Sequence, residues 1–241
     1  MRIAILSDIH GNFEALARVL EDMDRCRVDQ AVCLGDCIGY GPEPEAVITE
    51  IYRRGIPTII GNHEMAVCDR IHLQWFNPLA RQSLEKTITL LSEDSLDFIR
   101  HLPYSRTLLG CHLVHGYPPD SAQTYLFQKT SQEIKQTLTD MVPPICFIGH
   151  THDLEWIGYD GRRLERHPLH QGTTTLATDQ CHLINVGSVG QPRDGTNHAK
   201  YVIWDQAHAL LDTRFVTYDI ARTVAAIEAL GLPEAHARRL W

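Results

Sequence analysis

Short apolar runs alternate with stretches of helical periodicity over the first sixty residues. The runs have the length of strands buried on both faces, and they cover residues 3–6, 31–34 and 57–60. Between them, apolar residues at helical spacing predict one helix over 13–23, capped by Asn12, and another over 45–53, introduced by Pro44. This order of elements predicts a parallel sheet with right-handed crossovers.

From residue 65 to residue 102 the pattern is helical, with one break near Pro78. It predicts an inserted helical pair, whose two main segments are 79–91 and 95–101. We expect Trp75, Phe76 and Leu79 to pack between these helices. The alternative for these three side chains is a substrate clamp, and the 65–102 insertion that carries them could then lie over a site formed elsewhere and act as a cap.

The remaining residues are mostly of β character, with the turn Asp160-Gly161 as a strong hairpin signal. The expected strands are 104–109, 111–114, 145–148, 154–159, 163–167, 182–186, 200–204 and 210–218, and the expected helices are 131–141 and 220–230. Two mixed β-sheets with helices outside fit this order better than one doubly wound sheet. We therefore expect an α/β protein with a single domain over residues 1–241.

The composition is that of an ordinary globular protein, with 44% hydrophobic and 22% charged residues. A formal charge of -8 argues against stable nucleic-acid binding, which needs a basic footprint. The seven cysteines, an odd number, predict free thiols in a reducing compartment. No stretch predicts a signal peptide or a membrane span, so we expect a cytoplasmic protein. Homo-oligomer formation is left open.

Polar residues recur where the predicted strands end. Asp8 and His10 follow the first apolar run, and carboxylate and imidazole two residues apart are a metal-ligand spacing. Chemistry in an open α/β sheet gathers outside the carboxyl ends of its strands. The further strand ends of this kind are Gly35-Asp36, Gly61-Asn62-His63-Glu64, His115-Gly116 and Gly149-His150-Thr151-His152. Five such ends in one chain are hard to explain as turns or helix caps.

In this order the motifs resemble those of the calcineurin-like metallophosphoesterases: Asp-x-His, Gly-Asp, Gly-Asn-His-Glu, His-Gly and Gly-His-x-His. The match spans residues 3–152. The segments GDCIGYGPEP and NVGSVGQPRD are similar to small bacterial and archaeal phosphoesterases described as predicted phosphodiesterases. The resemblance implies a four-layer α/β/β/α sandwich and hydrolysis of phosphate mono- or diesters.

The resemblance also implies two divalent metal ions. One would be held by Asp8, His10, Asp36 and His152, and the other by Asp36, Asn62, His115 and His150. Asp36 would then bridge two cations roughly 3.5–4 Å apart, which need anionic charge between them. Imidazole and oxygen ligands without thiolate suit Mn, Fe, Zn or Ni, and we favour Mn.

The implied mechanism is attack on phosphorus by a hydroxide that bridges the metals, with Asp36 and His63 as the catalytic residues. His63 matches the family's general acid and would protonate the leaving oxygen. Glu64 either orients His63 or is a surface carboxylate that caps a short helix.

Substrate contacts are expected from Asn62, Tyr40 and Arg193. Tyr40 lies in a loop near Asp36, and Arg193 either contacts a phosphate or pairs with Asp194 within its own loop. The protein Ser/Thr phosphatases have Asp-Arg-Gly where this chain has Gly-Tyr-Gly at 39–41. This difference argues against a phosphoprotein substrate.

The expected partner is therefore a small phosphate ester or a nucleotide. A diadenosine polyphosphate hydrolase or a protein phosphatase of the same superfamily is the alternative within this chemistry. From another class, the alternatives are a non-catalytic scaffold with this fold and a nucleotide sensor. A scaffold has no reason to retain the full ligand set together with His10 and His63, which favours the enzyme. The nine histidines outside the motifs are expected to be surface or packed imidazoles.

Overall fold

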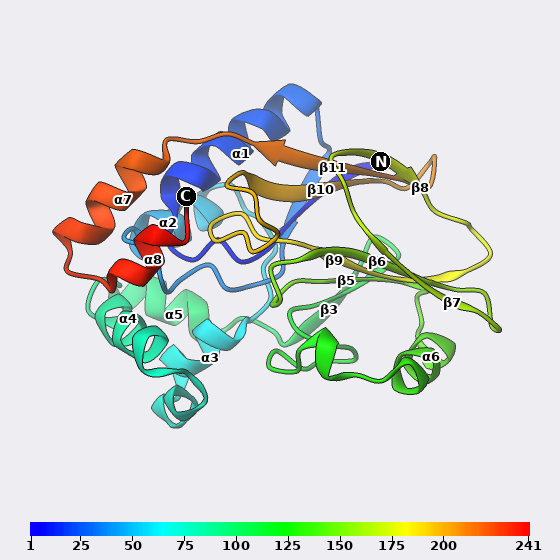
Figure 1. Cartoon of the computed structure of the whole chain (residues 1–241), viewed down its shortest axis with the longest axis horizontal. Coiled ribbons are helices and arrows are strands. Elements are labelled where there is room, and N and C mark those ends of the chain that lie inside the picture. Colours follow the sequence, from blue (N-terminus) through cyan, green and yellow to red (C-terminus); the bar gives the residue numbers. More distant parts are fainter.

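Two mixed β-sheets pack face to face, and helices cover their outer sides, in a computed structural model that describes residues 1–241 (Figure 1). The first sheet has the strand order β2-β1-β10-β11-β8. Its strands are β1 (Arg2–Leu6), β2 (Gln30–Cys33), β8 (Gly172–Thr175), β10 (Ala199–Asp205) and β11 (Leu210–Val216). Strand β1 is parallel to β2 and antiparallel to β10.

The second sheet has the order β3-β4-β5-β9-β6-β7. Its strands are β3 (Ser105–Leu108), β4 (Cys111–Val114), β5 (Ile145–Ile148), β6 (Leu154–Tyr159), β7 (Leu164–Pro168) and β9 (Cys181–Val186). Strands β4, β5 and β9 run parallel, and β6 and β7 form the antiparallel hairpin predicted around Asp160-Gly161.

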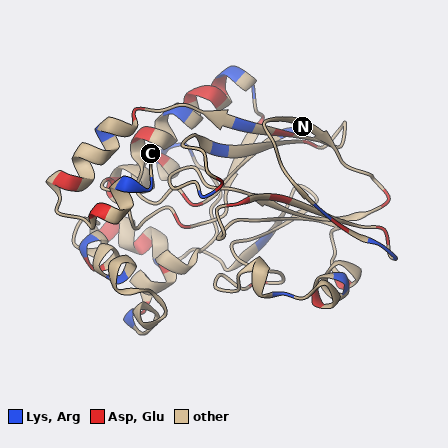
Figure 2. Cartoon of the chain, viewed as in Figure 1, with Lys and Arg blue, Asp and Glu red and all other residues tan.

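The helices lie on both sides of this pair of sheets (Figure 1). They are α1 (Phe13–Cys26), α2 (Pro44–Arg53), α3 (Asn62–Cys68), α4 (Pro78–Ile88), α5 (Glu93–Arg100), α6 (Ser131–Asp140), α7 (Ile220–Ala229) and α8 (Glu234–Arg238), with a 3-10 helix at Arg70–Trp75. None of the helices is both long and apolar enough to span a bilayer. Lys and Arg are interspersed with Asp and Glu on the helices in this view (Figure 2).

Alternation along β1 explains why this strand is apolar on both faces. Ala4 and Leu6 pack in the cluster that contains the buried face of α1, whereas Ile3 and Ile5 belong to the cluster between the two sheets. A third apolar cluster joins the second sheet to Ile134 of α6. The predicted four-layer α/β/β/α arrangement is confirmed.

Several expected elements differ from the structure. Residues 57–60 are an extended segment beside β2 with a single parallel bridge from Thr58 to Cys33, not a full strand. Pro57 has no N–H to donate to β2, and the Gly61 N–H, which would continue the ladder beyond Ile59, bonds to the Glu64 carboxylate instead. The pattern also missed β8 and α8.

The expected packing of Trp75 and Leu79 between helices is wrong. Their exposed fractions are 50% and 46%, because both side chains lie at the edge of the helical segment. Phe76 is partly buried and packs against the cluster that contains Leu73 and Leu84.

Candidate metal centre and active site

The loops that follow parallel strands of both sheets meet at one end of the molecule. Asp8 and His10 follow β1, and Asp36 follows β2. From the other sheet, His115 follows β4, and His150 and His152 follow β5, while Asn62 and His63 begin α3. All eight side chains belong to buried residues, with at most 9% of each residue exposed. The residues predicted from the strand ends thus lie in one region of the fold, although Asp8 and His152 are more than 140 positions apart in the sequence.

Several of these residues, and Tyr40 in the loop after Asp36, have left-handed backbone conformations, which L-amino acids rarely adopt. The φ angles are 55° at Asp8, 52° at His10, 51° at Asp36, 59° at Tyr40, 67° at His150 and 65° at His152. Hydrogen bonds between loops stabilise them, such as the one from the His10 N–H to the Asp36 carbonyl at 2.8 Å. Strained backbone of this kind is concentrated at functional sites.

A first cluster contains Asp8, His10 and His152. The Nδ1 atoms of the two imidazoles lie against the backbone carbonyls of Ile38 and Gln191, and they must therefore carry the hydrogens. The two Nε2 atoms then face each other at 3.0 Å as acceptors with no hydrogen between them. The His152 Nε2 is also 3.2 Å from Asp8 Oδ1, which is buried and accepts no hydrogen bond.

A second cluster contains Asp36, Asn62, His115 and His150. The His115 Nε2 lies 3.2 Å from Asn62 Oδ1, 3.2 Å from His150 Nδ1 and 3.3 Å from Asp36 Oδ2. The other ring nitrogens donate to the carbonyls of Leu34 and Gln123. Such second contacts are typical of metal-ligating histidines, because they fix the ring and leave one lone pair free.

Asp36 lies between the two clusters. Its Oδ2 is 3.8 Å from the His10 Nε2 in the first cluster and 3.3 Å from the His115 Nε2 in the second. Burial disfavours a charged His115, but the Asp36 and Asp8 carboxylates outweigh burial and raise the pKa of this imidazole to about 10. Burial lowers the pKa of His150 to about 3. The two buried carboxylates attract positive charge to this centre, and divalent cations would supply it in place of a protonated His115.

Glu64 is fully buried, so its interpretation as a surface carboxylate is wrong. It caps α3, because its Oε2 accepts from the Gly61 N–H at 2.9 Å. The same carboxylate accepts the backbone N–H groups of Asp36 at 2.8 Å, Cys37 at 2.8 Å and Ile38 at 3.3 Å. Burial, aided by the Asp36 charge, raises its pKa to about 7. Its hydrogen bonds fix the loop that carries Asp36.

His63 lies at the edge of both clusters. Its Nε2 is 3.8 Å from Asp36 Oδ2, and its Nδ1 is buried without a partner. Burial lowers the pKa of His63, against the raising effect of the Asp36 charge. Gly39 makes room for the ring: a Cβ at this position would lie 2.1 Å from the His63 Nδ1.

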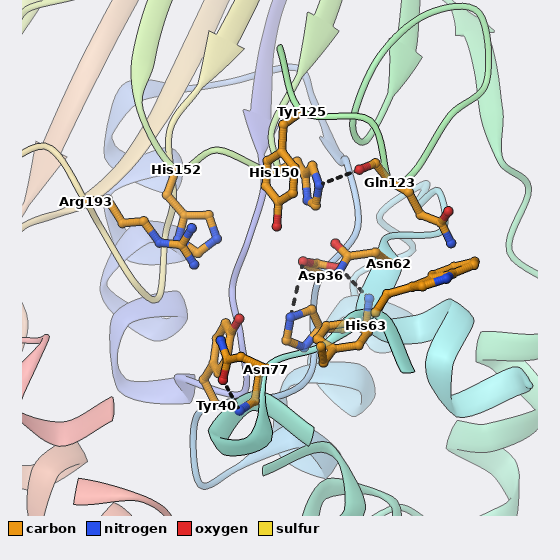
Figure 3. A pocket seen from close by; sticks show the side chains of 13 residues that line it. Asp36, Tyr40, Asn62, His63, Asn77, Gln123, Tyr125, His150, His152 and Arg193 are labelled. Carbon is orange, nitrogen blue, oxygen red and sulfur yellow. Dashed lines mark hydrogen bonds and ion pairs between the residues drawn. The ribbon is translucent and has the colours of Figure 1, made fainter. Parts of the chain in front are cut away.

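The clusters open into a cavity of about 270 Å³ (Figure 3). Tyr40 and Arg193 line it, with Arg193 on the His152 side and Gln123 on the opposite side. The expected alternative of an ion pair between Arg193 and Asp194 is wrong, because Asp194 pairs with Lys200 at 2.6 Å. The guanidinium of Arg193 instead lies 3.4 Å from the Gln191 side-chain oxygen.

The sequence patterns missed Tyr125 and Gln123, which also line the pocket. Tyr125 stacks on His150 with ring centroids 3.7 Å apart, and the Gln123 carbonyl fixes the same imidazole. The further lining residues are Trp75, Phe76, Asn77 and Ala80, from the helical segment. His236 of α8 lies 4.8 Å from the Tyr40 ring. Only their position in the fold connects these residues with the strand-end motifs.

Comparison with known proteins agrees with this geometry. Residues 1–208 match the calcineurin-like phosphoesterase superfamily domain. An uncharacterized protein of Methanocaldococcus jannaschii is 32% identical over 244 aligned residues, which cover 99% of this chain and 97% of that protein. The crystal structure of a metallophosphoesterase from Sphaerobacter thermophilus has 33% identity and a TM-score of 0.86, covering 100% of this chain and 98% of that one.

A hypothetical protein from Pyrococcus horikoshii has the same fold at 18% identity, with a TM-score of 0.77 over 100% of this chain and 97% of that one. The expected family is thus confirmed. The chain belongs to the calcineurin-like phosphoesterase superfamily.

Proposed function

We propose that this protein is a phosphoesterase that uses two divalent cations to hydrolyse phosphate mono- or diesters. One cation would be held by Asp8, His10, Asp36 and His152. The other would be held by Asp36, Asn62, His115 and His150. The observation that carries the proposal is the convergence of the ligand atoms. The Nε2 atoms of His10 and His152 face each other at 3.0 Å with no hydrogen between them, and the His115 Nε2 lies 3.2–3.3 Å from Asn62 Oδ1, His150 Nδ1 and Asp36 Oδ2.

Two cations at these positions would neutralise phosphoryl charge and activate a water molecule for attack on phosphorus. Arg193 lines the cavity and would bind a phosphoryl oxygen. His63 would protonate the leaving oxygen, and a substrate phosphate next to this ring would favour its charged form. Tyr40 forms part of the wall, and burial raises its pKa to about 12, so its hydroxyl stays protonated and can donate to a phosphate.

The donor set supports the choice of metal. It combines carboxylate, amide and imidazole groups, and the clusters of candidate ligands contain no cysteine. Such a set suits Mn, Fe, Zn or Ni, and the share of oxygen donors leads us to propose Mn.

Two further features belong to this proposal. Trp75, Phe76, Asn77 and Ala80 line the cavity, which supports a role of the 65–102 insertion as a cap over the site. The seven cysteines form no disulfide, which supports a cytoplasmic location.

The test is a hydrolysis panel on metal-stripped protein reloaded with Mn, Ni, Zn or Mg. The panel contains a monoester, bis-nitrophenyl phosphate, a cyclic nucleotide and diadenosine tetraphosphate. We expect hydrolysis that depends on the added metal and is lost in Asp36→Asn. No hydrolysis with any metal would contradict the proposal and favour a scaffold or a nucleotide sensor.

A further inference from the structure

The outer wall of the cavity is built from aromatic and amide side chains rather than from cations. Arg193 is the only Lys or Arg among the lining residues. The other wall residues beyond the metal clusters include Tyr40, Trp75, Phe76, Tyr125, Asn77 and Gln123. Aromatic faces and amides suit a planar ring with polar edges, whereas a chain of phosphates would need several cationic groups.

Three of the four aromatic rings are already engaged by the protein. Tyr125 stacks between His150, at 3.7 Å, and Phe127, at 4.8 Å. Phe76 meets the His63 ring edge-on at 4.9 Å. The Tyr40 ring lies within 4.8 Å of the rings of His10, His63 and His236.

Trp75 is the aromatic residue whose ring is accessible to a ligand. Half of this residue is exposed, and its single ring neighbour is His72, with centroids 4.2 Å apart and a tilt of 36°. Trp75 lines the same cavity as His63, and the adjacent Phe76 contacts the His63 ring, so the helical segment that carries Trp75 borders the part of the cavity where a leaving group would be protonated. Asn77 uses its side-chain oxygen to cap α4 through the Ala80 N–H, which leaves its amide hydrogens free to donate.

We propose that Trp75 determines substrate choice by stacking its free indole face on a nucleobase, or a similar planar heterocycle, carried by the leaving alcohol. The preferred substrate class is then a phosphodiester with a nucleoside arm. This inference rests on the proposed function, because it assigns the leaving arm to the His63 side. A cavity of about 270 Å³ is small for a ligand site and suits one such arm rather than two.

The kinetic test compares two diesters whose leaving alcohols have similar basicity: thymidylyl-thymidine and glycerophosphoglycerol. Hydrolysis by Mn-loaded protein is followed by chromatographic separation of the products. Trp75→Ala should lower kcat/KM for the nucleoside ester about tenfold, mostly through KM, and at least fivefold more than for the glycerol ester. Trp75→Phe keeps a ring and should recover most of the loss. The matched control is Trp241→Ala, which removes another exposed tryptophan outside the cavity. Equal losses for both esters would overturn the proposal.

A binding test separates this inference from catalysis. Adenosine monophosphate is titrated into metal-stripped protein while tryptophan fluorescence is recorded. We expect saturable quenching that disappears in Trp75→Phe and persists in Trp241→Phe. Quenching that is unchanged in Trp75→Phe would overturn the stacking site. Trp75-dependent quenching without hydrolysis of any ester would support the stacking site and contradict the proposed catalytic function.

Discussion

Replacement of Glu64 by glutamine tests whether the buried carboxylate holds the loop of Asp36. Each carboxylate oxygen accepts two backbone N–H groups: Oε1 accepts from Cys37 and Ile38, and Oε2 from Asp36 and Gly61. Glutamine has nearly the same volume but replaces one oxygen with an NH₂ group. The two backbone N–H groups that bonded to the replaced oxygen then face the NH₂ group, which is itself a donor. The other two N–H groups keep an oxygen acceptor, but it no longer carries a charge.

The expected cost follows from these bonds. A hydrogen bond to a charged group contributes about 1.5–3 kcal/mol, so the loss of two would cost roughly 3–6 kcal/mol. Removal of a buried charge offsets part of this cost, because burial disfavours the ionised carboxylate. We therefore expect the free energy of unfolding to fall by about 3 kcal/mol in Glu64→Gln at pH values above about 8, where the carboxylate is ionised.

The assay is urea unfolding of metal-stripped protein, combined with calorimetric titration of Mn. Metal affinity should fall about 10–100-fold, as is usual when a group that orients a ligand is removed. The matched control is Glu228→Gln, at an exposed position of α7 with no side-chain hydrogen bond or ion pair. An unfolding free energy within about 0.5 kcal/mol of the wild type, with unchanged Mn affinity, would refute the reasoning.

Four further outcomes are expected. His63→Ala should reduce turnover much more for esters with poor leaving groups than for nitrophenyl esters, and equal losses would remove its role as general acid. Gly39→Ala places a Cβ 2.1 Å from the His63 Nδ1 at a φ of +83°, and it should reproduce that selective loss; wild-type rates would contradict it. Burial would raise the pKa of Asp22, but hydrogen bonds from Arg214 and Tyr201 lower it overall. The ionised Asp22 carboxylate therefore stabilises the folded state above the pKa that Asp22 has in the unfolded chain, and this stabilisation is lost in acid. Asp22→Asn should therefore cost about 2 kcal/mol at neutral pH, a difference that shrinks as the pH falls below about 4 in urea unfolding; a constant difference would contradict the assignment. Mn at about 100 times its Kd should stabilise the wild type by about 2.7 kcal/mol for each occupied site in thermal unfolding, and Asp36→Asn should lose most of this gain; equal gains would place the metal elsewhere.

The strand-end residues could be predicted because each follows its own apolar run. A buried strand such as β1 is recognisable locally, and Asp8 and His10 are polar residues directly after it. The sheets then bring these ends together without further sequence signals. The family resemblance supplied the grouping into two sets of ligands, which stays a prediction; in the structure Asp36 lies between the two clusters.

The walls of the cavity could not be predicted in the same way. Trp75 and Leu79 occupy apolar positions at helical spacing, which is also the pattern of a packed helix, and only tertiary structure places them at the edge. Glu64 is next to His63 in the sequence, but three of its four partners lie 26–28 positions away. Arg193 follows β9, and its approach to His152 depends on how the loop after β9 turns.

The left-handed residues of the site have a consequence for how this protein can change over evolution. Glycine would occupy the positions of Asp8, His10, Asp36, His150 and His152 without steric conflict, and each native side chain there costs on the order of 1 kcal/mol of backbone strain. Selection for stability therefore favours glycine at these positions, whereas selection for activity favours the native side chains. A lineage released from the need for its reaction should accumulate glycines at these turns first, while its sheets stay unchanged.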